Sequence, residues 1–261
     1  MTCSQRLTPS PQGDHTLVVI PTYNEMETLP RILEEVWAQL PAAHILIVDD
    51  SSPDGTGEWV DERRTGEERL FVLHRGAKSG LASAYVDGMG WAIARGYPFI
   101  LQMDADGSHR PVDLPKLAAR MAGPDQPDLV IGSRWVAGGH INGWSAKRVA
   151  LSRVGNYYVR FCLGTPVRDA TAGLRLHRSS FLARHRVLER VATTGFGFQV
   201  EMTELERCLG AVIAEVPITF DERLAGESKL DSSIFIEELA MVTKGGLSRL
   251  AQAARSWFRR D

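Results

Sequence analysis

The feature of this sequence that most constrains its fold is a regular alternation of short apolar runs with longer stretches of helical periodicity. Five runs of five or six residues predict buried strands: 16–20, 44–49, 70–74, 99–103 and 128–132. The stretches between them that predict helices are 27–40, 56–64, 79–96 and 112–122. Alternation at this spacing predicts an α/β fold with a mostly parallel, Rossmann-like, doubly wound sheet flanked by helices.

The second half of the chain is less regular. It predicts helices over 146–161, 179–190 and 199–210, and a late strand over 212–218. Residues 1–14 are rich in Ser, Pro, Gln and Gly, which predicts a disordered tail.

Composition narrows the classes of function. The net charge of −2 with 44% hydrophobic residues is ordinary for a globular protein and argues against a nucleic-acid partner. Three scattered cysteines match neither a disulfide framework nor a zinc site, which favours a reducing cytoplasm. The N-terminus has no apolar signal segment and no apolar stretch approaches about 20 residues, which predicts a soluble or peripheral protein.

The charge is unevenly distributed along the chain. The window 134–190 holds 11 Lys and Arg residues but only two acids, Asp169 and Glu189. Such a basic window beside acidic flanks predicts two sub-sites, one of which binds an anion.

Polar segments follow each predicted strand, where parallel sheets bind their ligands. These segments are 21–25, 49–55, 74–80, 104–109 and 132–139. The fourth holds Asp104 and Asp106, two carboxylates that repel each other unless a cation lies between them. A turn would also explain this pair, but the convergence of five polar segments favours a metal ion that holds a polyphosphate.

Three motifs identify a resemblance. PTYNE (21–25), VDDSSPDGT (48–56) and MDADGSHRP (103–111) resemble, in this order, glycosyltransferase family 2, whose fold is called GT-A. GSRWVAGG (132–139), DATAGLR (169–175), GFGFQVEM (195–202) and ERLAGESK (222–229) are more specifically similar to polyprenol- or dolichol-phosphate mannosyltransferases, here of a type without transmembrane helices. The resemblance spans residues 16–230.

The resemblance implies a GDP-mannose donor and a Mg²⁺ or Mn²⁺ cofactor. Asp106 is the expected metal ligand and Asp104 is shared between metal and donor, while Ser108 replaces a Gln that the family often carries and is a third candidate ligand. The implied donor-binding residues are Pro21, Tyr23, Glu25, Asp50, Lys78, Gly80, Asp104, Ala105, Asp106, Gln199, Glu201, Arg223 and Lys229. For three of these residues a structural role would also explain the residue type. Tyr23 could pack in the core, Lys78 could be solvated at the surface, and Glu201 could stabilise the N-terminus of a helix by its charge.

The acceptor implied by the resemblance is a polyprenyl phosphate. Its phosphate is already ionised near neutral pH and needs cationic clamping rather than a general base. Arg134, Arg148 and Ser152 match the family's acceptor-phosphate positions. The residues expected to carry catalysis are Asp106, Arg148, Arg223 and Lys229, the last two by closing over the leaving diphosphate.

The C-terminal segment predicts contact with a membrane surface. Leu247, Leu250, Ala254, Trp257 and Phe258 share one helical face, with arginines on the other. Such an amphipathic helix lies in a membrane interface or packs on its own domain. We expect a protein associated peripherally with the cytoplasmic face of a membrane, with a membrane-anchoring protein as a possible partner.

The expected organisation is a tail (1–14), a GT-A catalytic domain (15–230) and a C-terminal amphipathic helical segment (231–261). The catalytic domain divides into a nucleotide-sugar half (15–133) and an acceptor half (134–230). Two alternatives to mannosyl transfer stay open. One is transfer of another sugar, such as glucose from UDP-glucose, to a polyprenyl phosphate. The other is a catalytically silent nucleotide-sugar-binding subunit of a membrane complex.

Overall fold

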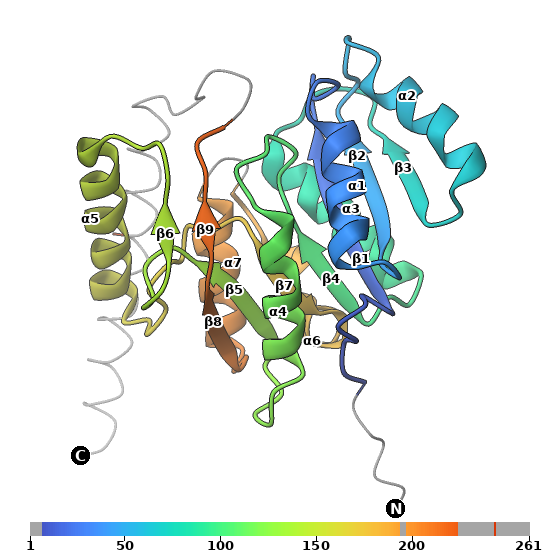
Figure 1. The fold of residues 1–261 in the computed structure, drawn as a ribbon. Helices are drawn as coiled ribbons and strands as arrows, with labels where there is room; N and C mark the ends of the chain where they lie inside the picture. Colours follow the sequence, from blue (N-terminus) through green and yellow to red (C-terminus); the bar gives the residue numbers. More distant parts are fainter. Residues whose placement is uncertain (1–6, 194–196, 224–242, 244–261) are drawn as a thin grey trace, which may run out of the picture.

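A seven-stranded mixed sheet forms the centre of the molecule (Figure 1), with strand order β3-β2-β1-β4-β7-β5-β8. The computed structural model describes residues 7–193, 197–223 and 243. The strands of the sheet are β1 (Thr16–Thr22), β2 (His44–Asp49), β3 (Leu70–His74), β4 (Phe99–Gln102), β5 (Leu129–Ser133), β7 (Arg175–Arg178) and β8 (Ile213–Pro217). A separate parallel pair joins β6 (His140–Ile141) to β9 (Thr219–Phe220).

Helices cover both faces of the sheet, as the sequence predicted. The helices are α1 (Leu29–Gln39), α2 (Thr56–Arg63), α3 (Leu81–Ala94), α4 (Leu114–Met121), α5 (Ala146–Leu163), α6 (Ser179–His185) and α7 (Phe198–Cys208). Short 3₁₀ turns lie at Arg64–Gly66, Pro111–Asp113 and Leu188–Arg190. Side chains of α1, α2 and α4 share one core cluster, and those of α3, α6 and α7 share another.

The first strand shows why the sequence encodes a sheet covered on both faces. Val18 and Ile20 belong to the α1 and α4 cluster, whereas Leu17 and Val19 belong to the α3 cluster. All four are fully buried. Because successive side chains of a strand point to opposite faces, a continuous apolar run is what a doubly covered strand requires.

Strand β7 was missed by the sequence analysis. It pairs antiparallel with both β4 and β5, so the sheet is mixed rather than wholly parallel. Its inward residues Arg175 and His177 are polar yet fully buried. Arg175 donates to the carbonyls of Ala170 and Ala172 at 2.7 Å, and His177 contacts Gln102 at 2.8 Å. Hydrophobic periodicity cannot reveal a strand whose buried side chains are satisfied by specific polar partners.

The ends of the chain differ in what the structure describes. Residues 7–14 were expected to be disordered, but the carbonyl of Leu7 accepts a hydrogen bond from Arg178 and that of Gln12 accepts one from Ala42. These contacts tie the segment to the sheet. Lys229 and the predicted amphipathic segment 231–261, apart from Thr243, lie outside the described residues.

No helix among the described residues is both long enough and apolar enough to span a membrane.

A glycine in α3 gives a prediction about stability. A Cβ at Gly88 would lie 2.5 Å from Val19 Cγ1 and 2.9 Å from Val48 Cγ2, so Gly88→Ala overpacks the core. We expect it to lower stability by about 1–3 kcal/mol, because overpacking outweighs the gain in helix propensity. Gly90→Ala in the same helix is the control, since nothing lies within 4 Å of its Cβ position. Thermal unfolding of both variants measures the difference, and equal melting temperatures would contradict this packing.

Candidate active site

The candidate site lies where β1, β2, β3, β4 and β5 end, because the five polar segments predicted from the sequence follow these strands. Parallel pairing of β1 with β2 and with β4 brings three of the segments side by side. The end of β9 also pairs with the segment after β4. Phe220 forms a β-bridge with His109, and the Asp221 N–H donates to the Ser108 carbonyl at 3.0 Å. Because Arg223 follows Asp221 by two residues, this pairing places Arg223 beside the Asp104–Asp106 loop.

Asp50, predicted to bind the donor, is held by two neighbours in the segment after β3. Its buried carboxylate accepts hydrogen bonds from the Arg75 guanidinium and from the Ser79 backbone N–H. The preceding Asp49 has a different role, since it accepts from Thr22 and Ser52 and so ties the end of β2 to β1. The two neighbouring acids therefore have different partners: Asp49 joins β2 to β1, and Asp50 joins the end of β2 to the segment after β3.

The other residues predicted to bind the donor at this end lie in or directly after β1 and in the segment between β3 and α3. Lys78 Nζ lies 3.8 Å from the centroid of the Tyr23 ring, so the two side chains form a cation–π pair. Gly80 caps α3 with a φ of +92°, and Pro21 lies within β1. The Glu25 carboxylate accepts from Thr28 at the start of α1.

Asp104 is fixed by a buried tyrosine. The Tyr85 hydroxyl donates to Asp104 Oδ1 at 2.7 Å, and burial together with Asp104 holds the pKa of Tyr85 well above its usual value. The Asp104 N–H donates to His109 Nδ1 at 3.2 Å, which leaves the proton of the neutral ring on Nε2. A Cβ on Gly173 would lie 3.2 Å from Asp104 Oδ2, so the 169–175 segment packs closely against this loop.

Asp106 is shared between a serine and an arginine. The backbone N–H and hydroxyl of Ser108 donate to Asp106 Oδ1 at 3.0 and 2.6 Å, and Arg223 Nε lies 2.6 Å from Oδ2. Ser108 is fully buried, so its hydroxyl orients Asp106. Arg223 balances the charge of a carboxylate that is 9% exposed.

The acidic pair fits a divalent cation that is bound together with a substrate. Among the described residues, no group of three or more His, Cys, Asp or Glu side chains would hold a metal alone. Mg²⁺ and Mn²⁺ commonly use one or two protein carboxylates plus phosphate oxygens. Asp104 and Asp106 supply two such carboxylates, and Arg223 now pairs with the second of them.

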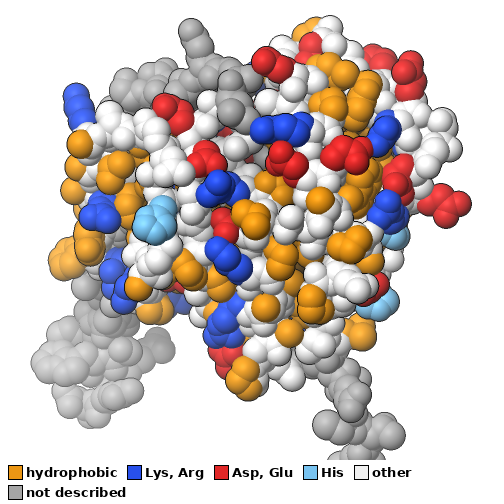
Figure 2. All heavy atoms as spheres, in the orientation of Figure 1, with side chains coloured by type: hydrophobic (Ala, Val, Ile, Leu, Met, Phe, Trp, Pro, Cys, Tyr) orange, Lys and Arg blue, Asp and Glu red, His pale blue; other side chains and the backbone are white. Residues whose placement is uncertain are grey.

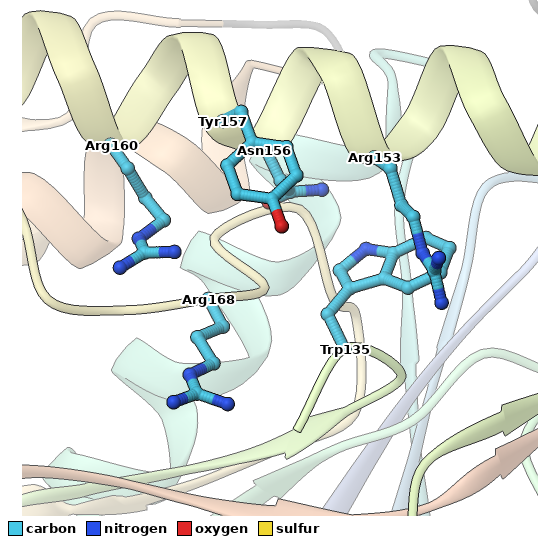
Figure 3. Close-up of a pocket in the computed structure, with 6 residues that line it drawn as sticks. All are labelled: Trp135, Arg153, Asn156, Tyr157, Arg160 and Arg168. Carbon is cyan, nitrogen blue, oxygen red and sulfur yellow. The ribbon is translucent and has the colours of Figure 1, made fainter. Parts of the chain in front are cut away.

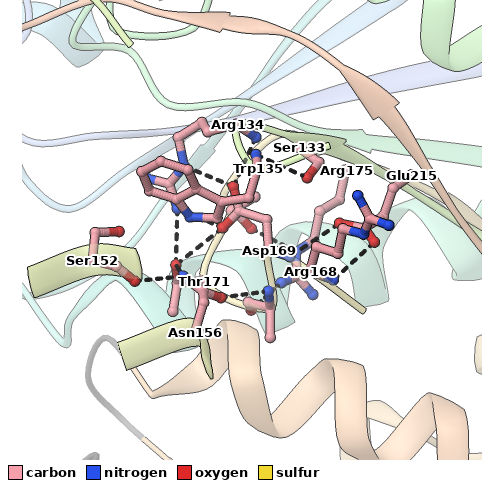
Figure 4. Close-up of polar contacts among 12 residues, drawn as sticks. Ser133, Arg134, Trp135, Ser152, Asn156, Arg168, Asp169, Thr171, Arg175 and Glu215 are labelled. Atoms are coloured by element: carbon pink, nitrogen blue, oxygen red, sulfur yellow. Dashed lines mark hydrogen bonds and ion pairs between the residues drawn. The ribbon is translucent and has the colours of Figure 1, made fainter. Parts of the chain in front are cut away.

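Arg134 is held in place by hydrogen bonds to Asp169 (Figure 4). Its Nε and Nη2 atoms donate to the two Asp169 oxygens at 2.8 and 2.6 Å, and its backbone N–H donates to the same carboxylate. Asp169 is fully buried. The guanidinium carbon also lies 5.6 Å from the Trp144 ring centroid and 5.3 Å from that of Phe220.

Arg148 lies in the first turn of α5, which Ser145 caps by accepting from the Arg148 N–H. Its guanidinium carbon stacks 4.0 Å from the Trp144 ring centroid, and Nη1 lies 3.6 Å from Glu222. Burial lowers the pKa of Arg148, as do Arg223 and Arg134, whereas Glu222 and Asp106 raise it. Arg134 and Arg148 contact the same Trp144 ring, and Arg148 pairs with Glu222, the neighbour of Arg223, so the three predicted cations lie close together.

The remaining predicted residues lie on α5 and α7. Ser152 is one turn further along α5, where its carbonyl accepts from Asn156. Gln199 is 7% exposed, and its Oε1 atom has no hydrogen-bond partner among the described residues. The Glu201 carboxylate accepts from the backbone N–H groups of Ala192 and Thr193, so it fixes the loop before α7.

The sequence analysis missed three residues that shape the site. Tyr85 lies inside a helix and gave no motif signal. Arg75 and Asp169 both lie in segments singled out by sequence, 74–80 and 169–175, but nothing in the pattern paired them with Asp50 and Arg134. Only the tertiary fold shows these pairs.

Comparison with known proteins shows to which family the chain is similar. The family model described as glycosyl transferase family 2 matches residues 17–186. An undecaprenyl-phosphate mannosyltransferase of Micrococcus luteus is 45% identical over 92% of this chain and 97% of its own length. A polyprenol monophosphomannose synthase of Mycolicibacterium smegmatis is 43% identical over 94% of this chain and 91% of its own length.

A solved structure supports the fold assignment. The mannosyltransferase PcManGT from Pyrobaculum calidifontis, in complex with GDP-Man and Mn²⁺, superposes with a TM-score of 0.57 at 15% identity, covering 94% of this chain and 67% of that one. The fold is thus the GT-A type, and the acidic pair after β4 lies at the edge of the sheet where such folds bind their ligands. The chain belongs to glycosyl transferase family 2.

Proposed function

We propose that this chain is an inverting enzyme that transfers mannose from GDP-mannose to a polyprenyl monophosphate, giving β-linked polyprenyl-phosphate-mannose and GDP. The similarity to two named polyprenyl-type mannosyltransferases over more than 90% of the chain supports the reaction class. The observation that carries the proposal is that Arg223 pairs with Asp106 at 2.6 Å, while Arg148 pairs with the adjacent Glu222 and shares the Trp144 ring with Arg134. A reaction in which a phosphate attacks a diphosphate-linked sugar needs carboxylates for the metal and cations for both anions.

The proposed chemistry follows from the charges of the two substrates. The acceptor phosphate is largely ionised near neutral pH and is therefore a nucleophile without a general base. Arg148, with Arg134 and Ser152, holds this phosphate for in-line attack on the anomeric carbon, whose bond to the diphosphate breaks as the new C–O bond forms. Direct displacement from an α-linked donor inverts the anomeric centre.

The donor diphosphate leaves with developing negative charge. Asp104 and Asp106 would hold Mg²⁺ or Mn²⁺, which would neutralise that charge when bound. Arg223 would move from Asp106 to the diphosphate oxygens, and Lys229 of the same segment would join it. Asp50 and the Lys78–Tyr23 pair would hold the nucleoside.

We propose that the enzyme works at the cytoplasmic face of a membrane, because its acceptor is a lipid. A membrane-anchoring protein partner stays a prediction from the sequence.

A turnover assay tests the proposal. The full chain is incubated with Mn²⁺ or Mg²⁺, a short polyprenyl phosphate in detergent and, in turn, GDP-mannose, GDP-glucose and UDP-glucose. We expect GDP-mannose to be used at least about tenfold better in kcat/KM than the other donors. A preference for UDP-glucose would show that the enzyme transfers glucose instead of mannose. GDP-mannose binding without turnover would indicate the alternative of a catalytically silent subunit.

A further inference from the structure

A second basic site lies on α5, outside the cluster around Asp106. It is a cavity of about 410 Å³ between α5, the 165–169 loop and the end of β5 (Figure 3). We call it the arginine pocket, and it is lined by Trp135, Arg153, Asn156, Tyr157, Arg160 and Arg168. Since an α-helix turns by about 100° per residue, Arg153 and Arg160 project from a flank roughly 120–140° away from Arg148.

The described residues that line the arginine pocket do not compensate its charge. Three of these six residues are arginines and none is an acid. Arg160 Nε and Trp135 Nε1 are buried without a hydrogen-bond partner among the described residues. Buried donors normally have partners, so these two are available to an acceptor atom of a ligand.

The arginines are already positioned around the cavity. The guanidinium carbon of Arg153 lies 4.9 Å from the Trp135 ring centroid. The loop that carries Arg168 is fixed because the Arg168 N–H donates to Glu215 Oε2 at 2.8 Å. Guanidinium groups bind phosphate oxygens with paired hydrogen bonds, and a cavity of this size accommodates a phosphate with its substituents.

The outer face of α5 is apolar instead of polar. Leu151, Val154, Tyr157 and Phe161 follow one another at intervals of three or four residues, with exposed fractions between 52% and 85%. Figure 2 shows hydrophobic side chains interspersed with basic ones along this edge of the molecule. An amphipathic helix normally buries its apolar face, and exposed apolar stripes mark interaction surfaces. Arginines beside exposed aromatic and aliphatic side chains suit an anionic lipid interface.

The arginine pocket also shares a wall with the acceptor site. The Asn156 Oδ1 atom accepts from the Ala170 N–H at 2.9 Å, and its Nδ2 donates to Thr171 Oγ1 at 3.1 Å. Thr171 Oγ1 in turn accepts from Arg134 Nη2 at 2.8 Å. A ligand in the arginine pocket would therefore fix α5 next to the residues proposed to hold the acceptor phosphate.

We propose that the arginine pocket binds the headgroup phosphate of an anionic phospholipid, while the apolar stripe of α5 enters the membrane surface. This proposal rests on the proposed function, because it names the surface by which an enzyme with a lipid acceptor meets the bilayer. The site is separate from the acceptor-phosphate site and takes a phospholipid that is not consumed.

Vesicle co-sedimentation of the full chain tests this proposal. The test variant is Arg153→Gln/Arg160→Gln/Arg168→Gln, and the matched control, Arg31→Gln/Arg64→Gln/Arg184→Gln, removes three exposed arginines elsewhere. On vesicles of phosphatidylcholine with phosphatidylglycerol, we expect the test variant to bind at least about tenfold more weakly, and the control to change less than about threefold. On phosphatidylcholine alone the two variants should not differ. If the triple variant melts early, Arg153→Glu alone replaces it, because Arg153 is exposed.

Two further measurements separate the other possible ligands. Binding of inorganic phosphate is measured by ³¹P line broadening. If the three arginines are needed for this broadening but not for vesicle binding, the ligand is a free phosphate and the proposal is overturned. The KM for a short polyprenyl phosphate in detergent should change less than about twofold in the test variant; a tenfold rise would place these arginines in the acceptor site instead. If the wild-type chain transfers no sugar but its vesicle binding still depends on the three arginines, the proposed function fails while the lipid site stands.

Discussion

Asp106→Asn is expected to reduce mannosyl transfer by roughly a thousandfold or more. The amide oxygen of the substituted side chain would still accept the hydrogen bonds from Ser108, which now reach Asp106 Oδ1 at 3.0 and 2.6 Å, so the loop should keep its shape. What is lost is the negative charge that faces Arg223 and that would hold the divalent cation. A metal that neutralises a leaving diphosphate contributes several kcal/mol to the transition state, which corresponds to the expected loss in rate.

The variant is checked by two measurements in addition to turnover. Mn²⁺ binding in the presence of GDP, followed by electron paramagnetic resonance, should weaken in parallel with the loss of activity, while the melting temperature stays near that of the wild type. Asp125→Asn is the control, because this acid pairs with Arg120 in an exposed position beyond the end of α4. Wild-type activity in Asp106→Asn would remove Asp106 from the metal site.

The fold could be predicted to the extent that burial follows from hydrophobic periodicity. Val18 and Val19 face opposite core clusters, and a continuous apolar run such as the one that contains them is typical of a strand covered on both faces. Strand β7 has no such signal, since its buried Arg175 and His177 each have a side-chain partner distant in sequence, Thr203 and Gln102 respectively. Arg175 contacts Thr203 at 2.9 Å, and burial lowers the pKa of this arginine to about 10. Neither partner can be deduced from the local pattern.

The positions of the candidate site residues could be predicted, but their partners could not. Polar residues after parallel strands must converge at one edge of the sheet, and this rule brings Asp50 and Asp106 to the same crevice. That Arg75 pairs with Asp50, or that Arg223 reaches Asp106, depends on how loops far apart in sequence pack. Ser108, predicted as a candidate ligand, donates its hydroxyl proton to Asp106.

The two arginines predicted for the acceptor phosphate differ in a way that only the structure shows. Arg134 is 7% exposed and pairs with Asp169 through Nε and Nη2, so its removal would leave a buried carboxylate unpaired and damage the fold. Arg148 is 31% exposed, stacks on Trp144 and pairs with Glu222 only at 3.6 Å. Arg148 is therefore the better position for separating a role in binding from a role in folding.

Arg148→Ala is expected to reduce kcat/KM for the polyprenyl phosphate by about a hundredfold or more, with little change in the affinity for GDP. The guanidinium is proposed to hold the attacking phosphate, and a charge-assisted hydrogen bond to such a group contributes roughly 1.5–3 kcal/mol. Loss of orientation for in-line attack adds to this cost. The measurement is a steady-state titration of short polyprenyl phosphate at saturating GDP-mannose, together with calorimetric GDP binding.

Lys147→Ala is the matched control, because it removes one cation from the same turn of α5 at an exposed position. Its kcat/KM should stay within about threefold of the wild type, since an exposed charge is largely screened. Arg148→Lys keeps the charge but not the paired geometry of the guanidinium, so it should restore only part of the loss. A loss of GDP affinity in Arg148→Ala with an unchanged KM for the lipid would instead assign Arg148 to the donor. That outcome would also leave Arg134 and Ser152 as the remaining candidates for the acceptor phosphate.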